Sequence, residues 1–581
     1  MSSSNDKPTR EISPALADLC SDYWNWRMAD SPEFASAVGI RDYDDQLDDL
    51  SFEAHQRRYD QCEAFLARAR DLEPRLIRQQ DLTNLKAFKA EIQAYVDGFR
   101  FQGFLMPIGY SEGVHVDFER LVSYMTLEGV ADFEKVLARY RRLPKQIDQI
   151  ILLMKKGVEM GVVHHHISMK GVGKNIGRFV VSDATKSPLW TPFSQIPDTI
   201  IKEQRDLLRE KATEVITHQV SPAFEKLRDY VDNEYITRPD IAVTSLHEGE
   251  ARYEQLLKFH TSTNLSAEEI HQMGLEEVGR IQKEMAKIVE ELGFEMSVAE
   301  FSDMIRYDPK SYFNNPEDMM DKFKEIVYDT IEPKLEGIVR KRPKSDLELV
   351  ASPSCDGVLG YYLAGSYDGS RPGKFYVNTQ LYASIPRYEM MTLCLHEGNP
   401  GHHLQASHTM ESPHIPFFRR VIEDRNYQVS PSRFPINTGY LEGWGLYSED
   451  LGFDMNLYGD PYDRYGHYSY EIYRACRLVV DTGMHAFSWS RDRAIDFMKQ
   501  HTALATKNIE NEIDRYITFP GQAVGYKVGE LKIWELRKNA QRILGESFDL
   551  KEFHEIVLDS VGPLEVLEDE VTRWIEGERK K

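Results

Sequence analysis

Residues 395–405 read LHEGNPGHHLQ and bring three histidines and a glutamate close together in the chain. A catalytic zinc site needs neutral imidazoles and one further ligand around the metal, with an open position for water. It also needs a carboxylate that can accept a proton from that water. A helical His-Glu pair supplies a ligand and a base on adjoining faces. His396 and Glu397 are therefore the candidate first ligand and general base.

The second ligand does not follow the simple HExxH spacing, because Pro400 stands where the second histidine would be. Proline removes a helical hydrogen bond and crowds the preceding turn, and Gly401 tolerates a kink or bulge. Two residues extruded there would bring His402 to the position of the second ligand. An undistorted helix would instead put His403 on the face of His396, about 10 Å further along the axis. The kink favours His402, with His403 as the alternative.

The third ligand is expected on a second helix, in GYLEGWGLYSEDLGF (439–453). Glu442 and Glu449 are seven residues apart and can lie on one helical face. We predict that Glu442 is the ligand, because Gly443 beside it allows close packing against the metal-bearing helix. Glu449 or Asp450 would then hydrogen-bond a ligating histidine.

Most of the chain from about residue 12 to 350 has helical patterning. In 266–292, Ser266 and Glu269 have the capping-box spacing, apolar residues then recur at helical intervals, and Gly293 is a typical stop. Similar patterns cover 52–71, 83–98, 131–156 and 204–231. Residues 160–200 are rich in Gly, His, Ser and Pro, which predicts an irregular excursion.

Residues 351–386 carry the β-favouring stretches GYYLAG and KFYVNT, which predict a small sheet. Helical patterning returns after Pro386. We therefore expect a mainly α protein with a small β-sheet before the metal-binding helix. The expected organisation is a disordered tail (1–10), a helical lobe (11–350) and a catalytic region (351–581), the last two forming one continuous body.

Composition excludes several classes of function. The 581 residues include 71 Lys and Arg against 94 Asp and Glu, a net charge of −23, which disfavours binding to nucleic acid or anionic membranes. No apolar run approaches the roughly 18 residues of a membrane span. The polar start lacks a hydrophobic stretch, and the five cysteines form no CxxC or close pair. A cytoplasmic location is the expectation.

HEGNPGHHLQ (396–405) followed by YLEGWGLYSE (440–449) resembles the domain-of-unknown-function family DUF885, here with an HExxPGHH-type motif. Further matching stretches are SYDGSRPGKFYVNT (366–379), DTGMHAFSWSRDRAIDF (481–497) and IDRYITFPGQAVGYKVGELKIWELR (513–537). The family looks like a distant branch of the Glu-zincin metallopeptidases. The resemblance implies a zincin-like helical body with a deep cleft and one catalytic Zn²⁺ per chain. It also implies similarity to the oligopeptidase and angiotensin-converting-enzyme groups.

Further site residues follow from that resemblance. In such helical peptidases a tyrosine donates to the oxyanion that forms when water attacks a carbonyl. Tyr516, in a DRY sequence similar to an Arg-Tyr pair of the converting-enzyme group, and Tyr526, in GYKVG, are the candidates. His485 would be a second electrophilic group or a substrate contact. Arg515 would anchor a substrate carboxylate or support Tyr516.

Substrate contacts are also expected near the sheet. The strand Phe375–Thr379 is expected to pair with an extended peptide by strand addition, which makes Tyr376 and Asn378 candidate contacts. Arg371, next to Pro372 and Gly373, is expected to shape the rim of the cleft.

The sequence thus predicts a zinc-dependent hydrolase, most simply a peptidase that acts on short peptides with Glu397 as general base. One alternative is a non-catalytic member of the fold that binds peptides or a partner. The other is a zinc amidohydrolase that acts on a non-peptide amide.

Overall fold

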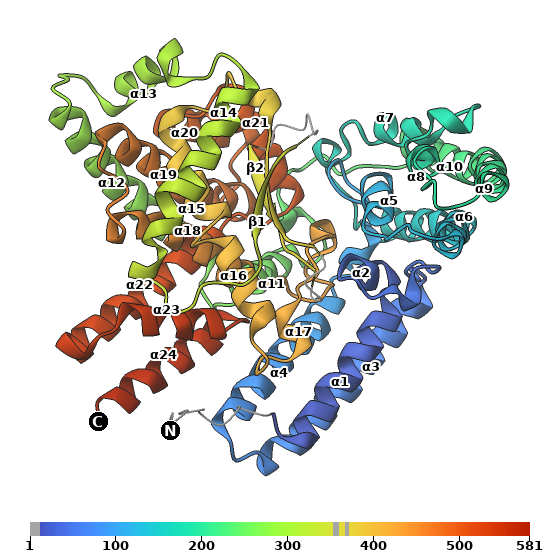
Figure 1. Cartoon of the computed structure of the whole chain (residues 1–581), viewed down its shortest axis with the longest axis horizontal. Coiled ribbons are helices and arrows are strands. Elements are labelled where there is room, and N and C mark those ends of the chain that lie inside the picture. Colours follow the sequence, from blue (N-terminus) through green and yellow to red (C-terminus); the bar gives the residue numbers. More distant parts are fainter. Residues whose placement is uncertain (1–11, 353–358, 367–370, 581) are drawn as a thin grey trace.

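A computed structural model of the chain describes residues 12–352, 359–366 and 371–580 and is mainly helical, with a three-stranded sheet (Figure 1). The tail predicted over residues 1–10 and Cys355 lie outside the described residues. The other four cysteines are buried and free. No helix in the described part of the chain combines the length and the apolar character needed to cross a bilayer.

The clearest predicted helix is confirmed in detail. Helix α12 spans Ala267–Glu291, and Ser266 caps it by accepting a hydrogen bond from the Glu269 backbone. The Glu269 carboxylate accepts in return from the Ser266 backbone at 2.8 Å. Two of the orphan N–H groups at the helix start are thereby satisfied. Gly293 follows with a positive φ of 80°, as a helix stop often does.

The first half of the chain forms helices at the other predicted places as well. The patterns at 52–71, 83–98 and 131–156 correspond to α3 (Phe52–Leu72), α4 (Gln79–Phe99) and α6 (Val130–Met160). The pattern at 204–231 corresponds to α9 (Lys202–Val215) and α10 (Ser221–Asn233), which are joined by a short π-helix at Ile216–Val220. Residues 160–200 contain only helices of five residues or fewer. The helices before the sheet, besides α12, are α1 Pro14–Asp30, α2 Pro32–Ala37, α3 Phe52–Leu72, α4 Gln79–Phe99, α5 Val114–Ser123, α6 Val130–Met160, α7 Val172–Ile176, α8 Thr191–Ser194, α9 Lys202–Val215, α10 Ser221–Asn233, α11 Gly249–Thr261, α13 Val298–Arg306 and α14 Pro316–Lys324.

These helices build more than one hydrophobic core. Buried hydrophobic residues between Ile108 and Tyr230 form a separate core. The helices that contribute to it, α5–α10, lie on one side of the molecule in Figure 1. The long helices α1, α3 and α4 form a second cluster, to which Phe418 and Phe434 also contribute. The N-terminal helices therefore pack against the segment that precedes α18 (Thr438–Asp454).

The sheet differs from the sequence prediction in two ways. Its strands are β1 Leu347–Ala351, β2 Gly360–Leu363 and β3 Gly373–Val377, in the order β1-β3-β2. β1 begins before residue 351, where the sequence still indicated the helical lobe. β3 is the central strand, parallel to β1 and antiparallel to β2. The prediction that a peptide adds to Phe375–Thr379 is therefore wrong, because both edges of β3 are already paired.

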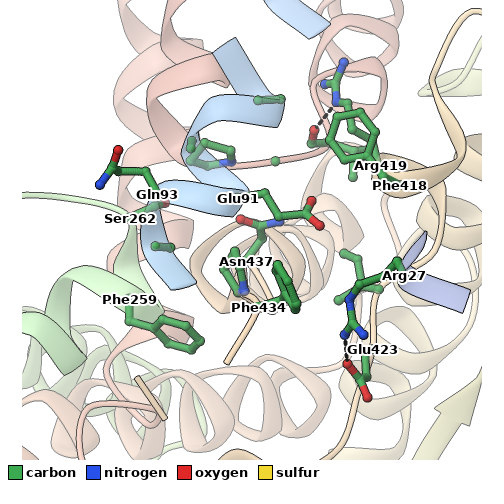
Figure 2. Close-up of a pocket in the computed structure, with 18 of the residues that line it drawn as sticks. Arg27, Glu91, Gln93, Phe259, Ser262, Phe418, Arg419, Glu423, Phe434 and Asn437 are labelled. Carbon is green, nitrogen blue, oxygen red and sulfur yellow. Dashed lines mark hydrogen bonds and ion pairs between the residues drawn. The ribbon is translucent and has the colours of Figure 1, made fainter. Parts of the chain in front are cut away.

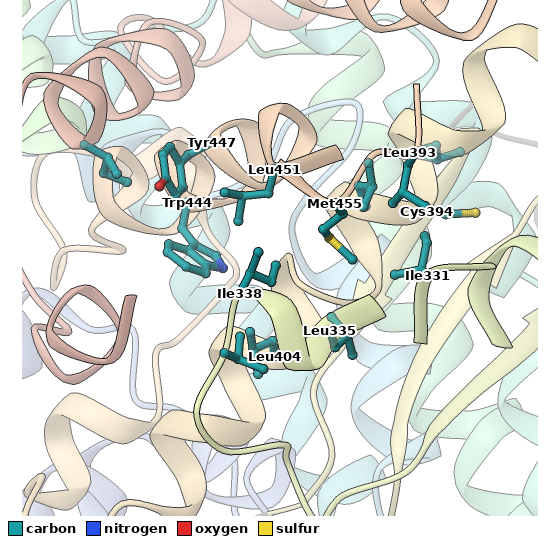
Figure 3. Packing of buried hydrophobic residues seen from close by; sticks show 14 of the residues in the cluster. Ile331, Leu335, Ile338, Leu393, Cys394, Leu404, Trp444, Tyr447, Leu451 and Met455 are labelled. Atoms are coloured by element: carbon teal, nitrogen blue, oxygen red, sulfur yellow. The ribbon is translucent and has the colours of Figure 1, made fainter. Parts of the chain in front are cut away.

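The second half of the chain surrounds the largest core. Figure 3 shows Leu393, Leu404 and Trp444 among the side chains that meet there, from three different helices. These helices are the ones that carry the candidate ligands. The helices after the sheet are α15 Met390–Glu397, α16 His402–Glu411, α17 Phe417–Arg420, α18 Thr438–Asp454, α19 Pro461–Ala486, α20 Arg491–His501, α21 Thr506–Thr518, α22 Gly525–Leu544, α23 Leu550–Asp559 and α24 Leu564–Glu578.

Glycines hold α18 and α22 at very close approach. A Cβ on Gly529 would lie 1.7 Å from the carbonyl oxygen of Gly439, and one on Gly443 would lie 2.5 Å from the backbone of Gly529. Gly443 thus packs against α22, and not against the metal-bearing helix as its position beside Glu442 suggested. The glycine of α18 that lies against His396 of α15 is Gly445, whose Cβ would lie 2.7 Å from the His396 ring.

This contact gives a stability prediction. Gly529→Ala forces α18 and α22 apart, so we expect it to lower the free energy of unfolding by about 1–3 kcal/mol, as overpacking of a core does. Gly279→Ala, in α12 with nothing within 4 Å of the new Cβ, should instead stabilise by about 0.5–1 kcal/mol. Urea unfolding followed by tryptophan fluorescence measures both. Equal midpoints for the two variants would contradict the close approach.

Candidate metal centre

The helix is interrupted between the two candidate histidines, His396 and His402. Helix α15 ends at Glu397 and α16 begins at His402. Gly401 allows the two helices to meet, since a Cβ there would lie 1.9 Å from the His396 carbonyl oxygen. The Pro400 carbonyl accepts a hydrogen bond from the Trp444 indole at 2.9 Å. The predicted break at Pro400 and Gly401 is thus present, and it is a full interruption of the helix.

The break brings His402 beside His396, and both face Glu442 of α18. The two ring centroids lie 4.7 Å apart. Glu442 Oε2 lies 3.5 Å from Nε2 of His396 and 3.5 Å from Nε2 of His402. One ligand atom from each residue lies within 4.8 Å of the others. Two histidines from successive helices and a glutamate from a third helix therefore converge on one point.

The spacing of these atoms suits a metal ion better than direct hydrogen bonding. A distance of 3.5 Å is too long for a good hydrogen bond, and the buried Glu442 Oε2 has no hydrogen-bond partner. Zinc bonds of about 2.0–2.1 Å in a tetrahedron would separate neighbouring ligand atoms by about 3.3–3.4 Å. The donor set, two imidazoles and a carboxylate, is one that zinc uses in catalytic sites. The residues present therefore fit a zinc ion.

His403 is engaged elsewhere. Its Nε2 donates to the Ser345 carbonyl at 3.1 Å, and its Nδ1 accepts from the Tyr362 hydroxyl at 3.2 Å. The ring is buried, and burial lowers the pKa of His403 to about 4. With both nitrogens in use, His403 links α16 to the sheet and leaves His402 as the residue that joins His396.

One face of α18 supports His396. The His396 ring lies over Gly445, with Glu442 one turn before it and Glu449 one turn after it. Glu449 accepts a hydrogen bond from His396 Nδ1 at 2.8 Å. This bond fixes the tautomer that leaves Nε2 free as a ligand. Asp450, the alternative partner considered from sequence, instead lies 3.0 Å from His467 Nε2.

Burial and charge act on the pKa values of these groups in opposite directions. Burial alone would lower the pKa of His396, but Glu442 and Glu449 raise it to about 10. Burial raises the pKa of Glu442, yet His396 and His402 hold it well below its usual range. Burial raises the pKa of Glu397, which is 9% exposed. Three carboxylates thus surround two imidazoles, an arrangement that favours a positive charge between them.

The two candidate tyrosines have different surroundings. Tyr526, at the start of α22, is half-buried, and burial together with the neighbouring Glu442 raises its pKa to about 12. The Tyr516 ring is 1% exposed, and its hydroxyl accepts from Arg477 and donates to Glu512, each at 2.8 Å. Arg477 also lies 4.4 Å from the Tyr526 ring centroid. Of the two tyrosines, Tyr526 is therefore the one that interacts electrostatically with the candidate ligand Glu442.

Arg515 and His485 make mainly structural contacts. Arg515 donates to Gln522 at 2.8 Å and to Glu512 at 3.2 Å. His485 is fully buried, its Nδ1 accepting from the Val243 backbone and its Nε2 donating to the Tyr516 carbonyl. Both ring nitrogens of His485 are occupied, so it has none left to contact a substrate.

The residues near the sheet are also engaged. The Tyr376 ring stacks on Tyr361 at 5.0 Å. The Asn378 side chain caps a short turn by accepting from the Gln380 backbone. Arg371 donates to the Ala37 carbonyl of α2 at 3.3 Å. Arg371 thereby ties the sheet region to the N-terminal helices.

Sequence reasoning missed two residues of this region. Gly445 lies on the same helical face as Glu442 and Glu449, a spacing that could have identified it. Arg474 of α19 lowers the pKa of Glu397 through its charge, and its Nε has no hydrogen-bond partner. It belongs to the tyrosine-rich stretch 461–475, which by sequence resembles ordinary helix packing, so no sequence signal marked it.

The comparisons with known proteins agree with this architecture. Residues 32–571 match the family described as "Bacterial protein of unknown function (DUF885)", so the chain belongs to DUF885. No curated protein matches it. A solved structure described as "the putative lipoprotein from Colwellia psychrerythraea" is similar, with a TM-score of 0.87 and 24% identity over 97% of this chain and 99% of that one. A "putative lipoprotein of unknown function from Shewanella oneidensis" matches with a TM-score of 0.69 and 17% identity over 95% and 99%. These likenesses show a shared fold.

The geometry predicts metal binding that depends on named residues. The purified protein should bind about one zinc ion per chain, as a single site requires. His396→Ala and Glu442→Ala should lose it, while the exposed His166→Ala, as a control, should keep it. Glu449→Gln should weaken zinc affinity by about 10- to 100-fold, because it removes the partner that orients His396. Metal analysis and a competitive chelator titration measure these effects.

Two results would contradict a zinc site formed by these residues. A wild-type protein that takes up no zinc even when zinc is added would exclude the centre. Zinc binding that survives His396→Ala and Glu442→Ala would place the metal elsewhere in the chain.

Proposed function

We propose that this member of DUF885 is a zinc-dependent hydrolase that cleaves an amide bond, most simply the peptide bond of a short peptide. The observation that carries the proposal is the convergence of His396, His402 and Glu442 next to Glu397. A site that only bound a metal or a peptide would have no use for a buried carboxylate adjoining the ligands. The same arrangement supports a distant relationship to the Glu-zincin peptidases.

The metal would be held by His396, His402 and Glu442. When bound there, zinc supplies a Lewis acid for a carbonyl oxygen and lowers the pKa of water. Glu449 keeps the His396 ring in the tautomer that presents Nε2. Gly445 leaves the space in which that ring lies. These residues thus position the site and do not themselves react.

Glu397 would transfer the proton. It follows His396 at the end of α15, so its carboxylate is fixed by the same helix that presents the ligand. As general base it would accept a proton from the attacking water and then deliver it to the leaving nitrogen. The charge of Arg474 lies close enough to influence Glu397. Burial raises the pKa of Glu397, and the charges of His396, His402 and Arg474 would oppose that shift and favour the carboxylate form.

Tyr526 would stabilise the developing oxyanion. Its hydroxyl is ionisable only at high pH, since its pKa is about 12, so it carries the proton that an oxyanion donor needs. The Tyr516 hydroxyl is already held by Arg477 and Glu512. Arg477 and Arg515 lie beside Tyr526. A substrate carboxylate near this position would meet cationic side chains.

The substrate proposal rests on analogy of fold. Helical peptidases with a deep cleft enclose short peptides, and we extend that expectation to this chain. Because β3 is central, an extended substrate could pair only with an outer edge of the sheet, of which β2 is one. A zinc amidohydrolase acting on a small non-peptide amide would use the same residues. The alternative that is not an enzyme is a protein that binds peptides or a partner. Glu397 counts against it, because a binding site has no need of a general base.

The cell location is a separate proposal. The sequence predicts the cytoplasm, whereas two proteins of the same fold carry the description "putative lipoprotein", so we propose the cell envelope as the alternative location. Fractionation of cells that express the full natural gene distinguishes the two locations for this chain.

The general base gives the sharpest test of activity. Zinc-loaded wild type should cleave members of a peptide library, with products identified by mass spectrometry. Glu397→Gln should bind zinc normally and lose about 10²- to 10⁴-fold in kcat, the usual contribution of a positioned base. Zinc-loaded wild type that cleaves neither peptides nor simple amides would favour the binding protein. Full activity in Glu397→Gln would assign the proton transfer to another group.

The two tyrosines can be separated by matched variants. Tyr526→Phe should lower kcat by about 10²- to 10³-fold with little change in KM, as loss of an oxyanion donor does. Tyr516→Phe should mainly lower thermal stability, because it breaks the bonds to Arg477 and Glu512. Steady-state kinetics and melting curves on both variants test this. The reverse pattern would move the oxyanion role to Tyr516.

A further inference from the structure

A cavity of about 230 Å³ lies apart from the candidate metal centre (Figure 2). Its walls come from α1, α2, α4, the end of α11, the segment 418–437 and the turn 561–565. None of His396, Glu397, His402 and Glu442 lines it. The exposed residues Lys258 and Glu565 stand among the lining residues, so the cavity reaches solvent on that side.

Most of the wall is apolar and aromatic. The small side chains of three alanines of α4 leave space on one side of the cavity. Aromatic rings from four different segments form much of the remaining wall. Such a surface with a few placed polar groups is typical of small-molecule sites. The rings and alanines are Trp24, Phe34, Phe259, Phe418, Phe434, Ala87, Ala90 and Ala94.

The two arginines of the cavity that are buried, Arg27 and Arg419, have partners within the protein, but only Arg27 is paired with an acid. Arg27 forms an ion pair with Glu423, and Arg419 donates to the Val561 carbonyl at 2.8 Å and to Asn84. Glu91 accepts one hydrogen bond, from the Tyr23 hydroxyl to Oε1 at 2.6 Å. Within the described residues no cationic group lies at ion-pair distance from Glu91.

Glu91 therefore presents an unmatched acid to the cavity. Figure 2 shows its carboxyl group pointing into the space between the labelled aromatic and arginine side chains. Burial raises the pKa of Glu91 to about 7, although Tyr23, Arg27 and Arg419 lower it in part. The carboxylate is thus destabilised by its surroundings, and an added cation would stabilise it.

We propose that this cavity binds a small amphipathic amine, whose ammonium group pairs with Glu91 and whose apolar body packs against the aromatic rings. Aromatic faces attract cations as well as apolar groups. A ligand carboxylate would be repelled by Glu91. The guanidinium groups of the cavity are already engaged, Arg27 by Glu423 and Arg419 by the Val561 carbonyl and Asn84. A cavity of ~150 Å³ accommodates benzene in another protein, so this one has room for a single ring with a short aminoalkyl chain.

Phenethylamine is a suitable probe, with 2-phenylethanol and 3-phenylpropionate as neutral and anionic relatives of the same ring. Isothermal titration of the full chain, stripped of metal, should give binding in the order amine, alcohol, acid. Metal-free protein keeps this result independent of the proposed hydrolase activity. Comparable or tighter binding of 3-phenylpropionate, or no binding of any probe at millimolar concentration, would overturn the proposal.

Variants locate the interaction. Glu91→Gln should weaken phenethylamine binding by about ten- to a hundredfold, the range expected for loss of a charge-assisted contact, and should leave 2-phenylethanol unchanged. Glu565→Gln is the matched control, because Glu565 lines the same cavity but pairs with Lys86 at 2.5 Å. It should not alter binding. Ala94→Phe fills the cavity and should abolish binding of amine and alcohol alike, with melting curves to confirm that each variant is folded. An unchanged amine affinity in Glu91→Gln would refute the assignment.

Discussion

The candidate centre depends on the contact of the His396 ring with one face of α18. Glu442, Gly445 and Glu449 follow one another along that face, and the imidazole lies over the glycine with a carboxylate at each end. A side chain at position 445 would displace the ring. Loss of Glu449 would free it to rotate. The position of α15 on α18 therefore sets the position of the first ligand.

The opposite side of α18 is constrained just as closely. Gly443 and Gly439 lie against Gly529, so α22 packs with its backbone almost in contact with α18. This approach places Tyr526, at the start of α22, close enough to Glu442 for their charges to interact. Ligand, supporting carboxylate and tyrosine are thus arranged by two glycine contacts on one helix.

The sequence predicted the features that depend on local spacing. The capping box of α12, the break at Pro400 and the shared face of Glu442 and Glu449 all follow from residues a few positions apart. The sequence did not predict features that depend on residues far away in the chain. The central position of β3 is fixed by β1, which begins before the predicted sheet region, and the use of His403 is fixed by Ser345 and Tyr362. The occupied nitrogens of His485 likewise depend on Val243, far away in the sequence.

The balance of buried charge connects the two regions that we interpret functionally. A buried carboxylate without a cation or hydrogen bonds is costly. At the candidate metal centre, Glu442 Oε2 has no hydrogen-bond partner and lies 3.5 Å from two imidazole nitrogens. In the aromatic cavity, Glu91 accepts a hydrogen bond from Tyr23 and no cation of the described residues lies at ion-pair distance. In the first case two imidazole nitrogens complete a donor set for a metal ion. In the second case aromatic rings surround the acid, and the group that would satisfy both acid and rings is an organic cation.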